Sequence, residues 1–242
     1  MKFFPKSARR SGRWQKKGWR ALWIAGMAIN VGNFAGAQTN AVPMVNAEKS
    51  DKHAYHPSNI FMAAGKLSAK LLRVAVLPLA AETESGSLPE GCSALTPVVW
   101  EQAVKSKRFE AITIDATKLR AATGRAAWTG GEVLPADFFE FLRREYACDA
   151  VLFGELTQFR AYAPLAVGWR FKLVDVNTGS VIWAADEIFD AADTRVAKAA
   201  QRFEHPKPLI PFMESGDWAI LNSPRRFGSF SAAALLETLP AR

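Results

Sequence analysis

Residues 172–190 read "KLVDVNTGSVIWAADEIFD", and this stretch predicts a β-hairpin. Two runs of alternating polarity flank a predicted three-residue turn at 177–179, where Gly179 supplies the left-handed backbone position. We expect Asp175 to help fix that turn. Counting outward, the predicted register pairs Val176 with Ser180, Val174 with Ile182, Leu173 with Trp183, Lys172 with Ala184, Phe171 with Ala185, Arg170 with Asp186, and Trp169 with Glu187.

The register gives the hairpin two different faces. Trp169, Phe171, Leu173 and Trp183 share one face, which must be buried, because a slip of one residue would expose all of them. On the other face, the opposed charges of Arg170 and Asp186 predict a cross-strand ion pair. The hairpin therefore packs against a core.

The sequence before the hairpin alternates between strand and helix patterns. Apolar or alternating runs predict strands at 71–80, 108–114 and 149–162, and helical spacing predicts helices at 95–107, 134–147 and 193–203. The resulting order is β-α-β-α-β-β-β-α. Helical crossovers favour parallel neighbours, and the last three strands favour an antiparallel meander. We predict an α/β (mixed, α+β-like) fold: a mixed sheet with helices packed on it and a C-terminal antiparallel hairpin meander.

The first 37 residues have the order of a secretory signal. A basic front precedes an apolar stretch from Ala21 to about Ile29 and the triplet Ala35-Gly36-Ala37, which has the form of a cleavage site. The apolar stretch is shorter than the roughly 20 residues of a permanent anchor. Arg9-Arg10 leaves twin-arginine export as an alternative. We expect cleavage after Ala37 and a periplasmic or secreted protein, with outer-membrane association left open.

The leader also accounts for the net charge of +8. Residues 1–37 contain eight of the 31 basic residues and none of the 23 acidic ones, so residues 38–242 carry 23 of each. The charge therefore gives no argument for a nucleic-acid partner. We expect no transmembrane span in the mature chain.

We divide the chain into a signal peptide (1–37), a flexible lead-in (38–67), an α/β domain (68–204), and a Pro-rich strap with a short C-terminal helix (205–242). Cys92 and Cys148 are predicted to be unbridged, because they fall at opposite ends of neighbouring parallel strands. The His53/His56 spacing is too loose to indicate a metal site. No metal or other cofactor is predicted.

Three short motifs resemble a known family. They are "RVAVLPL" (73–79), "DAVLFGEL" (149–156) and "LVDVNTGSVIWAADE" (173–187). Together they resemble the CsgG/LpoB-like family, of the curli secretion lipoprotein and penicillin-binding-protein activator type, with its TolB N-terminal-like α/β domain. The resemblance covers about residues 70–204. It implies an envelope protein that binds other proteins and has no catalytic residues to carry over.

Two features depart from that family. Its members are lipid-anchored, whereas this leader has no acceptor cysteine beside its cleavage site. A CsgG-type pore also needs membrane-spanning strands of alternating polarity, and the predicted loops at 81–92 and 115–133 lack that pattern. A pore is therefore not expected.

The sequence offers no strong catalytic motif. Nucleophile-elbow, zinc-peptidase and Walker patterns are missing from it. Glu155, Asp175 and Glu187 could form an acid/base pair, but we predict strand-face and turn roles for them. The glycine-containing stretch "ATGRAAWTGGE" (122–132) is predicted to be a loop, with a share in a binding surface as the alternative.

The tail has its own pattern. Residues 205–230 contain prolines at 206, 208, 211 and 224 with apolar residues between them. We predict an extended strap across the domain, followed by a helix at 231–239; the alternative is a partner-docking arm with a preformed extended backbone. The candidate partner-binding residues are Pro208, Ile210, Phe212 and Trp218.

These patterns lead to one leading hypothesis. We expect an exported, non-enzymatic cell-envelope protein that binds protein partners, as an accessory to envelope assembly, secretion or peptidoglycan synthesis. Homo-oligomer formation is left open. An exposed apolar strip along the tail or the sheet edge would favour this function.

Two alternatives belong to other classes. An exported hydrolase with an unrecognised site would be favoured by a pocket that joins Glu155 or Glu187 to another titratable group. A carbohydrate- or peptidoglycan-binding accessory would need exposed tryptophans. With Trp169 and Trp183 assigned to the core, the tryptophans considered for such a site are Trp100, Trp128 and Trp218.

Overall fold

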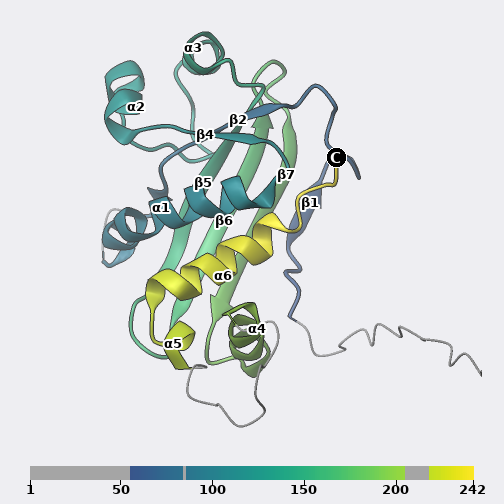
Figure 1. Cartoon of the computed structure of the whole chain (residues 1–242). Coiled ribbons are helices and arrows are strands. Elements are labelled where there is room, and N and C mark those ends of the chain that lie inside the picture. Colours follow the sequence, from purple (N-terminus) through teal and green to yellow (C-terminus); the bar gives the residue numbers. More distant parts are fainter. Residues whose placement is uncertain (1–54, 84–85, 205–217) are drawn as a thin grey trace, which may run out of the picture. The chain divides into compact units, whose positions relative to one another are not determined.

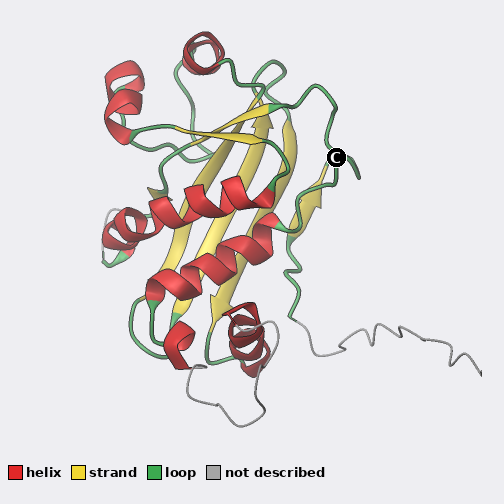
Figure 2. Cartoon of the chain, viewed as in Figure 1, coloured by secondary structure: helices red, strands yellow, loops and turns green. Residues whose placement is uncertain are grey.

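The computed structural model describes residues 55–83, 86–204 and 218–242 (Figure 1). Within these ranges a seven-stranded mixed sheet carries six helices, so the predicted fold class is confirmed (Figure 2). The strands are β1 (Ile60–Met62), β2 (Arg73–Val76), β3 (Ala80–Ala81), β4 (Glu110–Thr113), β5 (Ala150–Arg160), β6 (Ala166–Asp175) and β7 (Val181–Asp190). The helices are α1 (Leu88–Ser106), α2 (Ala116–Thr123), α3 (Phe138–Tyr146), α4 (Thr194–Glu204), α5 (Trp218–Leu221) and α6 (Pro224–Leu236).

The sheet has the order β1-β7-β6-β5-β2-β4, with β3 pairing with β5 off this path. β2 lies parallel to both β4 and β5, whereas β5, β6 and β7 form the predicted antiparallel meander. The short β1 adds an antiparallel strand to the outer side of β7. The two edges of the sheet are therefore β1 and β4.

The predicted hairpin register is confirmed from Leu173–Trp183 outward to Trp169–Glu187. Nearer the turn it is wrong, because Val174 pairs with Val181 and a bulge takes up Ile182. The bulge has a packing reason: the consecutive residues Ile182 and Trp183 both pack in the same core cluster, whereas consecutive residues of a regular strand point to opposite faces.

The turn has Gly179 at the predicted left-handed position, but it is longer than predicted. The Asp175 N–H donates to the Ser180 carbonyl at 2.9 Å, and the Val176 N–H donates to the Asp149 carbonyl instead of pairing with Ser180. The Asp175 carboxylate accepts hydrogen bonds from the backbone N–H groups of Asn177 and Thr178 at 2.8 and 2.9 Å. Gly179 has a φ of +70°, which a glycine adopts at little cost.

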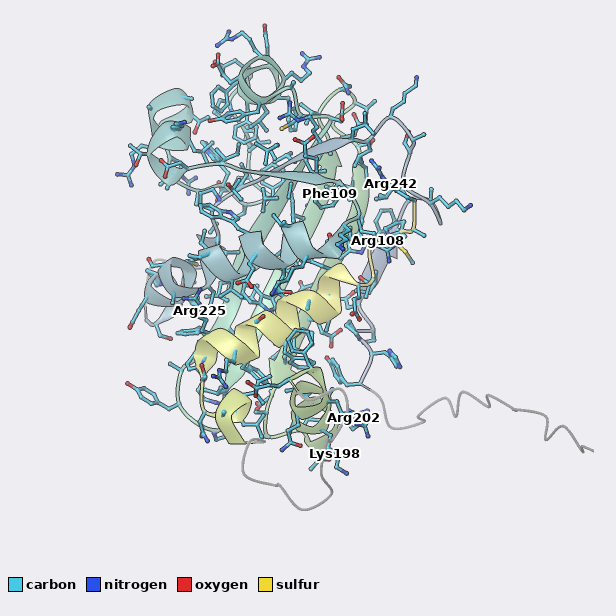
Figure 3. The ribbon with its side chains drawn as sticks, viewed as in Figure 1. Arg108, Phe109, Lys198, Arg202, Arg225 and Arg242 are labelled. Atoms are coloured by element: carbon cyan, nitrogen blue, oxygen red, sulfur yellow. The ribbon has the colours of Figure 1, made fainter. Side chains whose placement is uncertain are left out.

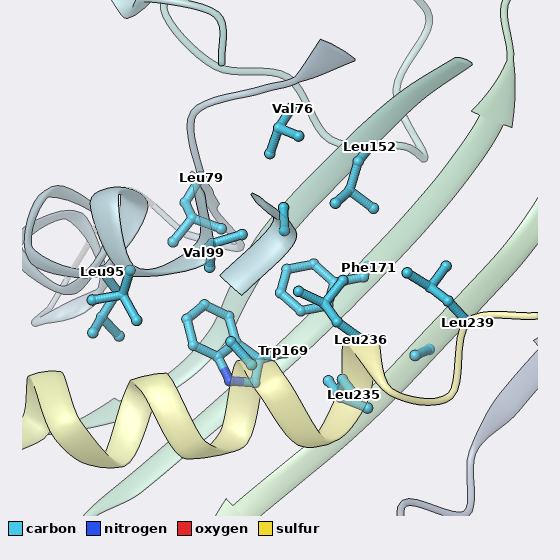
Figure 4. Packing of buried hydrophobic residues seen from close by; sticks show 14 of the residues in the cluster. Val76, Leu79, Leu95, Val99, Leu152, Trp169, Phe171, Leu235, Leu236 and Leu239 are labelled. Atoms are coloured by element: carbon cyan, nitrogen blue, oxygen red, sulfur yellow. The ribbon is translucent and has the colours of Figure 1, made fainter. Parts of the chain in front are cut away.

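Hydrophobic clusters cover both faces of the sheet. On one face α1 and α6 pack over the aromatic side of the hairpin, where Trp169, Phe171 and Trp183 are buried (Figure 4). On the other face α2 and α3 cover Val151 and Phe153 of β5. Cys92 belongs to the first cluster and Cys148 to the second, and no disulfide joins them, as predicted.

Several predicted boundaries need correction. The interval 81–92 is not all loop, because α1 begins at Leu88 with Pro89 in its first turn, where proline costs no hydrogen bond. The interval 115–133 contains α2, whose N-cap Asp115 accepts hydrogen bonds from Thr117 and Lys118. The lead-in was expected to be flexible up to residue 67, yet β1 lies within it.

The strap prediction is wrong for residues 224–230. They form the first half of α6, with Ser223 as N-cap and Pro224 at the start. α6 packs against α1, and Trp169 donates a hydrogen bond from its indole N–H to the Ser231 hydroxyl at 2.8 Å. α6 therefore completes the main core. Residues 205–217 lie outside the described residues.

A candidate protein-binding surface

Among the described residues, part of one sheet face is not covered by helices (Figure 1). At the strand ends away from α2 and α3, the side of β5, β6 and β7 opposite α1 and α6 carries partly or fully exposed side chains. We call this region, together with β1, the open face. Its exposed and half-buried side chains include Phe61, Gln158, Arg160, Arg170, Ala184, Asp186, Ile188 and Asp190.

The open face and its edge expose large apolar side chains. Phe61 is 53% exposed, Met62 49% and Ile188 53%. Phe61 stands opposite Ala184 on the same face as Ile188, whereas Met62 stands opposite Trp183 and lies on the other side of the sheet edge. Among the described strands β1 pairs only with β7, so its outer side remains available for another strand. The sequence reasoning missed these residues; the apolar triplet "IFM" within a polar segment was the available signal.

Glu187 holds the segment before β1 in place. Its carboxylate accepts hydrogen bonds from the Tyr55 hydroxyl and the Ser58 N–H, both at 2.8 Å. The Tyr55 ring packs against Phe189 with ring centroids 5.3 Å apart. Burial, followed by the hydrogen bond to Glu187, raises the pKa of Tyr55, so its hydroxyl stays protonated and continues to donate.

A charged cluster occupies the middle of the open face. The Arg170 guanidinium lies 2.8 Å from Asp186, 3.3 Å from Glu155 and 3.4 Å from Glu82. The hydrogen bond to Asp186 is the main cause that raises the Arg170 pKa, and this guanidinium remains charged. The predicted Arg170–Asp186 ion pair is therefore present. Because the groups are partly exposed, its contribution to stability is small, about 0–1 kcal/mol.

The three carboxylates considered as acid/base candidates are not brought together. Glu155 lies on the open face beside Arg170, whereas Glu187 lies on the opposite side of the sheet, where it binds the segment before β1. Asp175 accepts the turn hydrogen bonds. These positions match the predicted strand-face and turn roles.

The tail candidates are placed only in part. Pro208, Ile210 and Phe212 lie outside the described residues, and Trp218 begins α5. α4 ends at Glu204 and α5 contacts both α4 and α6. The two ends of the segment 205–217 are therefore attached to the helices α4 and α5.

The helices near these attachment points carry a positive charge surplus. Residues 88–108, 194–204 and 218–242 contain nine basic and four acidic side chains, although residues 38–242 as a whole are balanced. Figure 3 shows Arg108 and Arg242 near one end of α6, Arg225 near the other, and Lys198 and Arg202 on α4. We call this region the basic helix layer.

The basic helix layer also contains a groove with a mixed polar and apolar lining. The groove has a volume of about 350 Å³ and is lined by residues of α1, α4 and α6. Phe203, in the last turn of α4, lines it and is 45% exposed while packing edge-on against Phe230. Lys105 and Arg108 line the same groove.

Among residues 55–83, 86–204 and 218–242, no three His, Cys, Asp or Glu side chains gather in a group that could hold a metal ion. Within the same ranges, every helix is too short or too polar to cross a bilayer.

No protein-family model and no curated protein matches the chain. Among solved structures, the chain is similar to the PelC dodecamer from Paraburkholderia phytofirmans, with 17% identity, 76% of this chain and 98% of PelC covered, and a TM-score of 0.43. It is also similar to E. coli LpoB, with 14% identity, 76% and 90% coverage, and a TM-score of 0.34. A third structure is the lipoprotein GNA1162 from Neisseria meningitidis, with 18% identity, 49% and 79% coverage, and a TM-score of 0.33.

LpoB, one of the two proteins for which the sequence resemblance is named, is thus among the structural neighbours. The similarity to CsgG remains a prediction. All three TM-scores lie below 0.5, and the functional conclusions below therefore rest on the chain's own residues.

Proposed function

We propose that this protein is an exported, non-enzymatic cell-envelope protein that binds another protein through the open face of its sheet. The observation that carries the proposal is the pair of large exposed apolar side chains on this face, Phe61 and Ile188. Large apolar side chains on a surface are typical of protein interfaces. The unpaired outer side of β1 would add main-chain hydrogen bonds to an extended segment of the partner.

The exposed Arg170–Asp186 pair on the same face would give the contact its specificity. A partner would meet this fixed pair of charges beside the apolar residues, whereas Glu155 is buried and is not part of the proposed contact. Fixed polar groups at the rim of an apolar contact favour one partner over others by penalising unpaired charges. In this proposal the protein serves as an accessory to envelope assembly, secretion or peptidoglycan synthesis.

We retain the tail as a second contact, through Pro208, Ile210, Phe212 and Trp218. Its ends are attached to α4 and α5, beside the basic helix layer. A partner held by the tail would therefore approach a surface rich in Lys and Arg. We propose that the part of the partner facing the tail is acidic.

The alternatives have less support. The hydrolase hypothesis needed Glu155 or Glu187 in a pocket with another titratable group, and each carboxylate is instead bound on its own side of the sheet. For the sugar-binding hypothesis, Trp128 is buried and Trp100 donates its indole N–H to the Leu77 carbonyl at 3.4 Å. Neither indole offers an open platform.

Affinity capture from cells that produce tagged variants tests the proposal. Phe61→Asp and Ile188→Asp should each reduce the yield of co-purified partner by about tenfold or more, as expected for centrally placed contacts. Glu155→Gln is the matched control on the same face and should leave capture unchanged. Circular dichroism should confirm that all three variants are folded.

The tail is tested separately with Ile210→Asp combined with Phe212→Asp. This variant should weaken capture, and the capture that remains should be greater at low salt, where the attraction of an acidic partner to the unchanged basic helix layer is strongest. Loss of activity in the cell with Glu155→Gln, while the protein stays folded and abundant, would contradict the proposal and favour an enzyme.

A further inference from the structure

A cavity lies next to residues 79–81, which follow the C-terminal end of β2. It has a volume of about 490 Å³, within the range of about 300–1,000 Å³ of small-molecule sites. One wall is formed by residues 79–81 and by Pro89 and Cys92 of α1. The facing wall is formed by α2 and the loop after it. A second hollow of about 300 Å³ shares Leu79 and Ala126 with this cavity, so the two adjoin.

The position of this cavity follows from the topology of the sheet. After β2 the chain crosses through α1 on one face and returns as β4 on one side of β2. After β4 it crosses through α2 and α3 on the other face and returns as β5 on the other side of β2. The connections that leave the neighbouring strands β2 and β4 therefore run to opposite faces of the sheet. In open α/β sheets such a divergence creates a crevice at the C-terminal ends of the strands, where ligands bind.

The loop that closes the cavity is the glycine-containing stretch 122–132, and its conformation is well supported. Trp128 is buried and donates its indole N–H to the Thr123 hydroxyl at 2.8 Å. Arg125 lies over the Trp128 ring, 4.8 Å from its centroid, and 2.8 Å from the Glu132 carboxylate. Lys172 of β6 donates a hydrogen bond to the Gly130 carbonyl at 2.8 Å. The wall is therefore preorganised.

The cavity combines apolar walls with a surplus of positive charge. Its charged lining residues are Arg120, Arg125 and Glu132, which leaves one net positive charge. Arg125 is paired with Glu132, whereas the Arg120 guanidinium has no hydrogen-bond or ion-pair partner among the described residues. The other lining residues are small or apolar, including Leu79, Ala80, Ala81, Pro89, Ala126 and Ala127.

We infer that this cavity binds a small molecule with an anionic group, a carboxylate or a phosphate, on a compact apolar body. Arg120 would bind the anionic group through charge-assisted hydrogen bonds, with Arg125 adding a second guanidinium already held in place. The apolar body would lie against residues 79–81 and Ala126. This ligand site is separate from the protein-binding surface proposed above, and either could exist without the other.

Titration of the exported chain with three small probes tests the inference. Phenyl phosphate and benzoate carry the two candidate anions on the same ring, and benzyl alcohol is the neutral control. Binding can be followed by the NMR signals of the arginine Nε–H groups and by tryptophan fluorescence. We expect at least one anionic probe to bind more tightly than benzyl alcohol, and the tighter of the two identifies the anion.

Arg120→Gln should weaken binding of that probe by about tenfold, the loss expected for one charge-assisted contact. Arg143→Gln, an exposed arginine in the last turn of α3, is the matched control and should bind as the unmodified chain does. The inference is overturned if neither anion binds, if benzyl alcohol binds equally well, or if Arg120→Gln changes binding no more than Arg143→Gln.

Discussion

Replacing Trp183 with alanine tests whether the hairpin organises the main core. Trp183 is 0% exposed, its ring stacks on Phe171 with centroids 6.5 Å apart, and it stands opposite Leu173 in the strand register. Truncating a buried aromatic side chain removes its transfer free energy and leaves a cavity, at a combined cost of about 3–5 kcal/mol. The free energy of unfolding should fall by that amount.

The polar part of this loss should be small. The Trp183 indole N–H donates to the Thr238 hydroxyl at 3.2 Å, and that hydroxyl also bonds to the Leu235 carbonyl at 2.6 Å. Thr238 therefore keeps a partner in the variant, and no buried polar group is orphaned. Since domains of this size are stable by about 5–15 kcal/mol, the substitution should remove a large share of the total.

Urea unfolding followed by circular dichroism measures the change. Trp183→Phe, which keeps most of the buried ring, should cost less than Trp183→Ala. Ile188→Ala is the control on the same strand, and it should stay within about 0.5 kcal/mol because its side chain is largely exposed. If Trp183→Ala cost less than about 1 kcal/mol, the hairpin would not be the organising element of the core.

Three further predictions concern the turn, the strand edge and the thiol. Asp175→Ala should destabilise the domain by about 0.5–1.5 kcal/mol in urea unfolding, because two backbone N–H groups lose their acceptor; an unchanged midpoint would contradict the turn assignment. Because the folded-state pKa of Tyr55 is raised, its contribution to stability should be complete below the unfolded value of about 10 and decline as the pH rises above it. Absorbance at alkaline pH, compared with Tyr55→Phe, should show one tyrosine ionising late, and a difference curve centred near 10 would refute this. Burial raises the pKa of Cys148 to about 11, so iodoacetamide should alkylate it far more slowly in the folded than in the unfolded protein, and equal rates would count against a buried thiol.

The sequence predicted those parts of the fold in which local pattern and tertiary packing agree. The hairpin register is correct where aromatic and apolar residues alternate strictly, as at Phe171 and Trp183. It fails at Ile182, because Ile182 and the next residue, Trp183, pack in the same core cluster, which a regular strand does not allow. That packing depends on a core cluster formed by distant segments, which local alternation does not reveal.

The missed elements owe their stability to contacts that are distant in sequence. β1 is three residues long, and the segment before it is held by Glu187, more than 120 residues away, so the apolar triplet 60–62 alone was too short to specify a strand. In the tail, the spacing of the prolines predicted an extended strap that included Pro224, although proline also suits the first turn of a helix. α6 forms because its apolar stripe packs on α1 and the hairpin.

The position of α6 in the main core determines how the tail can be tested. A truncation after Phe203 would remove α6 and with it part of the main core, so lost binding could not be distinguished from unfolding. Substitutions at Ile210 and Phe212 avoid that problem. Glu187→Gln is likewise unsuitable as a neutral control, because Glu187 anchors the segment before β1.

Photo-crosslinking in intact cells tests the central claim, partner binding through the open face, most directly. A photoreactive residue replaces Phe61 in one strain and Val133, an exposed side chain in the loop before α3, in another. We predict that position 61 gives a discrete crosslinked product with a second envelope protein, identified by mass spectrometry, and that position 133 gives none. Equal labelling at both positions, or no product at position 61 from a folded and exported protein, would contradict the account.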